Sequence, residues 1–219
     1  LKGFFIFMDN FLSKFPKATF KYYNSVLDAC IAVQKNNADA AAYDEPILRN
    51  IAAKNPGLIV LPDMITVDSY GFAVKSDNLK LKATIDSVLY NLRADGRYGE
   101  MMKRWLPEKG SPGNMPFFMG NSENGKLKFG TSAVTEPFSF IDNSGQITGF
   151  DIEIANHIAM ALGVELEIVD MDFGAMIPAL VSGKVDLIGA CITISEERAK
   201  KVLFSEPYYT GGIAALVKE

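Results

Sequence analysis

Apolar residues recur along the chain with two periods, one typical of helices and one typical of strands. Helical spacing follows a cap at Asn24 or Ser25 and returns over residues 79–92 and 152–162. Further helices are predicted over residues 9–14, 45–53, 98–105 and 175–182. Short apolar runs bounded by turn residues predict strands over residues 1–7, 19–23, 38–43, 58–61, 69–75, 127–131, 165–169, 185–190 and 213–218. This alternation predicts an α/β protein with mostly parallel sheets.

One segment breaks the alternation. Residues 107–125 are rich in Pro, Gly, Asn and Ser and show no periodicity, so they are predicted to be a linker. Within the linker, Phe117 and Phe118 are expected to dock on a surface. A new series of alternating strands and helices is expected to start after the linker, at Lys126.

Composition and charge exclude several classes of function. The formal net charge is −4, and no face rich in Lys and Arg stands out, which argues against nucleic-acid binding. No apolar run approaches the ~20 residues of a membrane span. No secretory signal peptide is recognisable, which favours a mature or trimmed form.

The two cysteines and the single histidine offer no metal or nucleophile chemistry. Cys30 fits a helix core, and Cys191 is small and expected to face a cleft. His157 lies in a helix with apolar periodicity, where a structural role is expected. Zinc chemistry and a Ser-His-Asp site are both poorly supported, and no cofactor is predicted.

Residues 185–198 combine a buried strand, a polar turn and the start of a helix. Ser195 is a predicted N-cap, and Glu196 and Glu197 follow where the helix dipole favours acids. Arg198 then offers a planar fork that fits a carboxylate in two-point contact. The segment alone leaves two interpretations open, an anion-binding corner and a capped surface helix with a solvated arginine.

An internal similarity favours the first interpretation. Residues 36–44 resemble residues 183–191: Asp39 matches Asp186, and Asp44 falls where Cys191 does. Ligands of open α/β sheets bind beyond the carboxyl ends of strands. If two such lobes face each other, Asp44 and Arg198 would meet across one cleft. An acid opposite an arginine suits a zwitterion, which predicts a site for a free amino acid.

Several motifs resemble those of the amino-acid substrate-binding proteins of ABC transporters. This resemblance covers nearly all the chain except the linker. It implies the two-lobed, type II periplasmic-binding-protein fold, in which each lobe is an open, mostly parallel sheet flanked by helices. The motifs are Pro137-Phe-Ser-Phe-Ile-Asp142 with Gly149-Phe-Asp-Ile-Glu153, Asp172-Phe-Gly-Ala-Met-Ile-Pro-Ala-Leu180 with Lys184-Val-Asp-Leu187, Ile192-Thr-Ile-Ser-Glu-Glu-Arg198 with Phe204-Ser-Glu-Pro-Tyr-Tyr209, Leu1-Lys-Gly3, Asp44-Glu-Pro46 and Arg93-Ala-Asp-Gly-Arg-Tyr98.

The resemblance also implies ligand contacts. Arg198 would bind the α-carboxylate together with the main-chain N–H of Thr193. The Thr193 hydroxyl, the Cys191 carbonyl and Asp44 would take the α-ammonium, and Phe173 would pack on the ligand side chain. The loop residues Ser132 and Thr135 complete the expected ligand-binding set.

The order of the lobes is inverted relative to the family. Residues 1–68 correspond to the second lobe, residues 69–106 to a hinge strand and the C-terminal helices that pack on the first lobe, and residues 126–219 to the first lobe, which ends in the other hinge strand. Two origins fit this order, a circular permutant and a tandem array of binding domains, and the tandem array is favoured. The halves would pair within one chain or with halves of another molecule.

The function implied is capture of an amino acid by hinge closure, outside the cytoplasm, for delivery to the membrane subunits of an ABC transporter. Two other functions fit the same fold. One is the ligand-sensing domain of a membrane receptor kinase, with an anchor outside this chain. The other is an enzyme, a dehydratase or a lytic transglycosylase, for which only Glu136 and Asp44 could serve as acid or base.

Overall fold

The computed structural model describes residues 14–23, 25–107, 111–119 and 124–219. Its contacts divide the chain into two compact units. The smaller unit holds Leu1–Val67 together with Gly212–Glu219, and the larger unit holds Asp68–Gly211. The chain therefore passes between the units twice, and each unit is described by itself.

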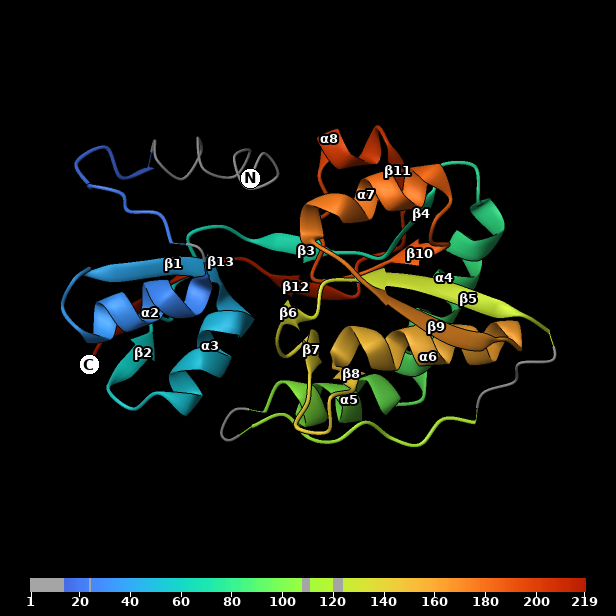
Figure 1. Cartoon of the computed structure of the whole chain (residues 1–219), viewed down its shortest axis with the longest axis horizontal. Coiled ribbons are helices and arrows are strands. Elements are labelled where there is room, and N and C mark those ends of the chain that lie inside the picture. Colours follow the sequence, from blue (N-terminus) through green and yellow to red (C-terminus); the bar gives the residue numbers. More distant parts are fainter. Residues whose placement is uncertain (1–13, 24, 108–110, 120–123) are drawn as a thin grey trace. The chain divides into compact units, whose positions relative to one another are not determined.

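The described residues of the smaller unit form a three-stranded sheet with two helices packed on it (Figure 1). Strand β13 lies in the centre and runs antiparallel to both neighbours, β1 and β2. Buried apolar side chains from the helices and the sheet form its core, Leu48 and Leu216 among them. The elements are α2 (Val26–Gln34), β1 (Ala40–Asp44), α3 (Glu45–Lys54), β2 (Leu58–Val60) and β13 (Ile213–Lys218).

The larger unit is built on a five-stranded sheet of order β11-β4-β10-β5-β9. Strands β10, β5 and β9 run parallel, whereas β4 is antiparallel to both β10 and β11. Helix α7 covers one face of the sheet, and α6 covers the other face with α4 and α5 against it (Figure 1). The strands are β4 (Ala73–Lys75), β5 (Lys126–Thr131), β9 (Glu165–Asp170), β10 (Leu187–Ile188) and β11 (Val202–Phe204), and the helices are α4 (Leu79–Ala94), α5 (Arg97–Trp105), α6 (Phe150–Leu162), α7 (Phe173–Ser182) and α8 (Glu196–Ala199).

Two small sheets complete the larger unit. Strands β3 (Asp68–Tyr70) and β12 (Tyr209–Gly211) pair antiparallel, next to the two points where the chain leaves the unit. Strands β6 (Val134–Thr135), β7 (Ser139–Ile141) and β8 (Ile147–Thr148) form a meander between β5 and α6.

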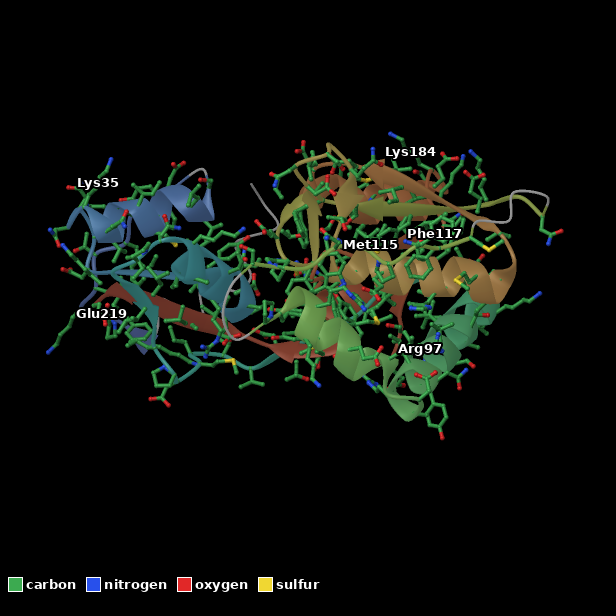
Figure 2. The ribbon with its side chains drawn as sticks, turned by 90° about the horizontal axis from the view of Figure 1, so that it is seen from below. Lys35, Arg97, Met115, Phe117, Lys184 and Glu219 are labelled. Carbon is green, nitrogen blue, oxygen red and sulfur yellow. The ribbon has the colours of Figure 1, made fainter. Side chains whose placement is uncertain are left out.

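The described residues 111–119 of the predicted linker contact the larger unit. The Gly113 amide donates a hydrogen bond to the Arg104 carbonyl at 2.7 Å. The Phe118 ring packs edge-on against His157, with centroids 5.0 Å apart, and a structural role for His157 stays a prediction. Phe117, which Figure 2 labels, is 89% exposed and does not dock as expected.

The α/β prediction is confirmed, but the sheets are mixed rather than mostly parallel. The expected strand over residues 69–75 is divided into β3 and β4, because residues 69–71 pair with residues 192–194 before the chain enters the main sheet. The expected strand over residues 213–218 forms, but its two neighbours both belong to the smaller unit.

Other differences are local. Residues 19–23 form no strand, and most of their side chains are exposed, so their alternating pattern has no sheet to face. The strand expected over residues 185–190 is limited to β10. The strand predicted over residues 1–7 and most of the helix predicted over residues 9–14 lie outside the described residues.

Candidate functional site

Three loops meet at one edge of the larger sheet. Strands β5, β9 and β10 are parallel, so the segments that follow them leave from the same edge. Residues 132–135 follow β5, Phe173 begins the helix after β9, and residues 191–198 follow β10. Six of the seven residues expected to bind ligand are therefore placed at this edge by the topology.

The helix start predicted at Ser195 is confirmed. Ser195 has an extended backbone, and its hydroxyl oxygen accepts a hydrogen bond from the Arg198 amide at 3.3 Å. The helix that follows, α8, is only four residues long, with Glu196 and Glu197 exposed in its first turn. The cap therefore fixes the direction in which the Arg198 side chain leaves the main chain.

Arg198 contacts two of the other expected residues. Its Nη1 donates a hydrogen bond to the Thr193 carbonyl at 2.9 Å. Its guanidinium carbon lies 5.5 Å from the centre of the Phe173 ring, within the range of a cation–π contact. The partly buried Arg198 is thus in contact with groups from two different loops, and its role in anion binding stays a prediction.

The orientation of Thr193 follows from its pairing with Tyr70. The Gly71 amide donates to the Ile192 carbonyl at 3.0 Å, and the Ile194 amide donates to the Ser69 carbonyl at 2.8 Å. This is the antiparallel arrangement in which the two facing residues exchange no hydrogen bond with each other. The N–H and C=O of Thr193 therefore point away from residues 69–71, and its C=O reaches Arg198.

Cys191 turns the chain at this edge. Its backbone has a φ of 48°, in the left-handed region that costs energy for any residue other than glycine. The thiol is buried, and the amide donates a hydrogen bond to Asp151 Oδ2 at 3.1 Å. The turn is therefore held by a side chain from α6.

Ser132 and Thr135 are buried in the loop after β5. The Thr135 hydroxyl lies 3.1 Å from the Ser132 carbonyl and 3.3 Å from the Ser139 carbonyl, and the loop is tied to β9 by the Ala133 amide, which donates to Asp170 Oδ1 at 2.9 Å. These contacts give the loop a defined shape, and a ligand role for Ser132 and Thr135 stays a prediction.

Asp44 belongs to the smaller unit. It is the last residue of β1, pairs in register with Ile213 of β13, and is half-buried. The structure thus places Asp44 at a strand end as the internal similarity predicted, and its role in binding stays a prediction.

Asp151 is the residue that sequence reasoning did not single out. It is fully buried, and its Oδ2 accepts hydrogen bonds from the Cys191 amide at 3.1 Å and from the Tyr208 hydroxyl at 2.9 Å. Burial raises the pKa of Asp151 to about 7, although both hydrogen bonds act in the opposite direction. Burial also raises the pKa of Tyr208 well above its usual value. The available signal was the Gly149-Phe-Asp motif, which gave a resemblance but no role for the acid.

The same motif explains how Asp151 reaches this position. Gly149 has a φ of 132°, and a Cβ there would lie 2.2 Å from the Phe138 carbonyl oxygen, so only glycine fits. The Phe150 amide donates to the Pro137 carbonyl, and the Asp151 amide donates to the Phe138 carbonyl. These bonds fix the first turn of α6 against the loop after β6.

Among the described residues, no group of three or more His, Cys, Asp or Glu side chains is arranged to hold a metal ion. Within the same residues, no helix has the length and hydropathy that a membrane span requires.

Comparison with known proteins places part of this chain in a family. Residues 127–219, somewhat less than half of the chain, match the bacterial extracellular solute-binding proteins, family 3. The resemblance to amino-acid-binding proteins is confirmed for this segment, which contains α6, α7, α8 and the loops of the candidate site.

Individual relatives match stretches of similar length. An L-cystine-binding protein of Escherichia coli is 41% identical over 97 residues, which are 44% of this chain and 36% of the relative. An arginine-binding extracellular protein of Bacillus subtilis is 46% identical over 91 residues, 41% of this chain and 35% of the relative. The match thus spans little more than a third of the length of these relatives.

Among solved structures, the arginine-bound form of domain 1 from TmArgBP is 46% identical, and the match covers 43% of this chain and 81% of that one, with a TM-score of 0.39.

Proposed function

We propose that this chain binds a free α-amino acid at the sheet edge formed by residues 132–135, Phe173 and residues 191–198. The observation that carries this proposal is the half-buried Arg198, held by the Thr193 carbonyl and the Phe173 ring at the carboxyl ends of parallel strands. The names of the relatives, which bind cystine and arginine, support an amino acid as the ligand.

Each expected residue has a chemical part in this proposal. Arg198 takes the α-carboxylate in its planar fork, and the Thr193 N–H, which points away from residues 69–71, adds a second donor. The Thr193 hydroxyl and the Cys191 carbonyl accept from the α-ammonium, and Phe173 packs against the ligand side chain. Ser132 and Thr135 shape the adjoining loop.

Two parts of the proposal rest on the resemblance. Asp44 is expected to add a carboxylate for the ammonium, and hinge closure is the expected mode of capture. An acid for the ammonium is also what the internal similarity between residues 36–44 and 183–191 predicts.

The proposed role is capture outside the cytoplasm for delivery to an ABC transporter, without chemical conversion of the ligand. The matched family consists of bacterial extracellular solute-binding proteins, and one relative is named an ABC transporter arginine-binding protein. If the role is binding alone, incubation followed by mass spectrometry recovers the bound amino acid unchanged. A converted product would support an enzyme instead.

The test of binding is isothermal titration calorimetry with the twenty standard amino acids and L-cystine. Arg198→Ala removes the partner of a desolvated carboxylate, which should weaken binding by about 2–5 kcal/mol. The control is Arg97→Ala, because Arg97 is an exposed arginine of the same unit that pairs with Asp95. Equal affinity in the Arg198→Ala variant and the native protein would refute the proposal.

A further inference from the structure

We propose that Asp151 is a positioning residue for the amino-acid site, whose buried carboxylate holds the main chain at Cys191 and thereby sets how firmly residues 191–198 are presented to the ligand. This inference rests on the proposed function. It concerns a residue that would not touch the ligand itself.

Two hydrogen bonds connect Asp151 to separate parts of the larger unit. The bond from the Cys191 amide holds the turn that leads to Thr193 and Arg198. The bond from the Tyr208 hydroxyl holds the segment that leads into β12. The Tyr208 amide in turn donates to the Tyr70 carbonyl at 2.9 Å, and Tyr70 is the residue that faces Thr193. One carboxylate therefore supports both sides of the paired segments 69–71 and 192–194.

The turn at Cys191 requires such support. A residue other than glycine at a positive φ is held there by its surroundings and not by its own preference. If the bond from the Cys191 amide weakens, the backbone can relax toward a negative φ, and that change moves the following residues. Thr193 is two residues further along the chain, and its carbonyl is the acceptor for Arg198.

Because of its second oxygen, the strength of the hydrogen bonds that Asp151 accepts depends on whether the carboxyl group is ionised. Oδ1 is buried and has no hydrogen-bond partner, so the ionised form is only half satisfied. A proton on Oδ1 removes the charge and leaves Oδ2 as a neutral acceptor, and hydrogen bonds to a neutral acceptor are weaker than those to a carboxylate. Burial, which raises the pKa to about 7, brings this change into the range of ordinary solution conditions.

Charged and titratable groups on other elements contact the main chain at Tyr208, a partner of Asp151. From α4, Arg93 Nη2 donates to the Pro207 carbonyl at 2.6 Å and to the Tyr208 carbonyl at 3.4 Å. From α5, the Tyr98 hydroxyl also donates to the Tyr208 carbonyl.

The remaining groups lie on α6, on β3 and after β10. On α6 itself, Glu153 is engaged by Arg104 and Trp105 of α5. From β3 comes the buried Tyr70, and the segment after β10 adds the Cys191 thiol.

The decisive variant is Asp151→Asn. An asparagine whose carbonyl takes the place of Oδ2 has the shape and charge of the protonated acid. L-Arginine serves as the probe, because its side chain stays charged throughout the range tested. We expect the native protein to bind the probe about five-fold more tightly at pH 8 than at pH 5.5, as expected for a carboxylate acceptor replacing a neutral one. The Asp151→Asn variant should bind equally at both pH values, with the affinity of the native protein at pH 5.5.

Two further variants separate positioning from mere stability. Tyr208→Phe removes one donor to Asp151 while keeping the ring, so it should move the midpoint of the affinity profile to higher pH. Glu153→Gln is the matched control, because Glu153 is buried two residues away on the same helix but contacts α5. It should leave the pH profile of binding unchanged even if it lowers stability.

The outcomes are distinguishable. If the native protein binds none of the amino acids, the proposed function fails and this inference fails with it. If the native protein binds but its affinity is independent of pH, or if Asp151→Asn keeps the native profile, only the role of Asp151 is refuted. Should Asp151→Asn not fold, an unshifted midpoint in Tyr208→Phe refutes it in the same way.

Discussion

The two segments that resemble each other in sequence end in different surroundings. In the smaller unit, β1 follows α2 after a short connection and continues directly from Asp44 into α3. In the larger unit, β10 follows α7, and the chain then makes a turn of several residues before α8. The neighbour of β1 is antiparallel, whereas β10 lies beside the parallel strand β5.

This difference has a consequence for function. Around β10 the carboxyl ends of three parallel strands share one edge, so loops from distant parts of the sequence gather there. Beside β1 the adjacent strand begins where β1 ends, since Asp44 faces Ile213, the first residue of β13. A similar local sequence therefore leads into a loop cluster in one unit and directly into a helix in the other.

The largest expected effect comes from Gly149, which places α6 against the loop cluster. Gly149→Ala would bring a Cβ to 2.2 Å from the Phe138 carbonyl oxygen, so the backbone must shift. We expect a loss of unfolding free energy above about 3 kcal/mol. Urea unfolding followed by the fluorescence of Trp105, the single tryptophan, reports on the larger unit.

Gly145→Ala is the control for this prediction. Gly145 also has a positive φ, but a Cβ there meets no atom within 4 Å. Its substitution should cost about 1 kcal/mol, the strain of the backbone alone. Equal losses in the two variants would show that the close approach at Gly149 does not matter.

Ion pairs offer a second contrast between the units. Glu153 is buried and binds Arg104 Nη1 at 2.6 and 2.8 Å, whereas in the smaller unit Glu45 pairs with the exposed Arg49. Glu153→Gln leaves the cation without its partner, and we expect a cost of about 3 kcal/mol. Glu45→Gln should cost less than about 0.5 kcal/mol. Circular dichroism in urea measures both, and similar costs would contradict the contrast.

The pH dependence of stability provides a third test, confined to the larger unit. The pKa of Asp151 is higher in the folded protein than the ordinary value of 3.8, so the folded state holds a proton that the unfolded state releases. The resulting stabilisation is complete below about pH 4 and is lost as the pH rises through about 7. The unfolding free energy of the native protein should therefore fall from pH 5 to pH 8, on the order of 2 kcal/mol relative to Asp151→Asn. Parallel curves for the two proteins would contradict this.

Local pattern was enough to predict most helices and the cap at Ser195, because these depend on residues three or four positions apart. The predicted strand over residues 19–23 was wrong, since alternation alone does not supply a neighbouring strand. The break after Tyr70 could not be predicted either, because it depends on pairing with Thr193, more than a hundred residues away.

In the candidate site, too, local features differ from features that depend on residues far apart in the sequence. The contact between Arg198 and Thr193 spans five residues within one motif, and the ligand roles expected of both residues stay predictions. The importance of Asp151 depends on Cys191 and Tyr208, which lie 40 and 57 residues further along the chain. No periodicity carries such information, and the resemblance supplied a motif without its physical reason.

The smallest expected effect concerns the ends of the two similar helices. Helix α2 is followed by Asn36 with a φ of 58°, and α7 is capped by Gly183 with a φ of 78°, so both stop through a left-handed residue. Gly183→Asn should cost no more than about 1 kcal/mol, because Asn tolerates this conformation better than other residues with a Cβ, and because the nearest atom to a new Cβ is the flexible Lys75 Nζ. Asn36→Gly should change stability by less than that.

Gly183→Val is the control, since a β-branched residue at positive φ should cost clearly more than Asn. If Asn and Val cost the same at position 183 in urea unfolding, the two helix ends are not equivalent, and the similarity between the segments stops at the sequence.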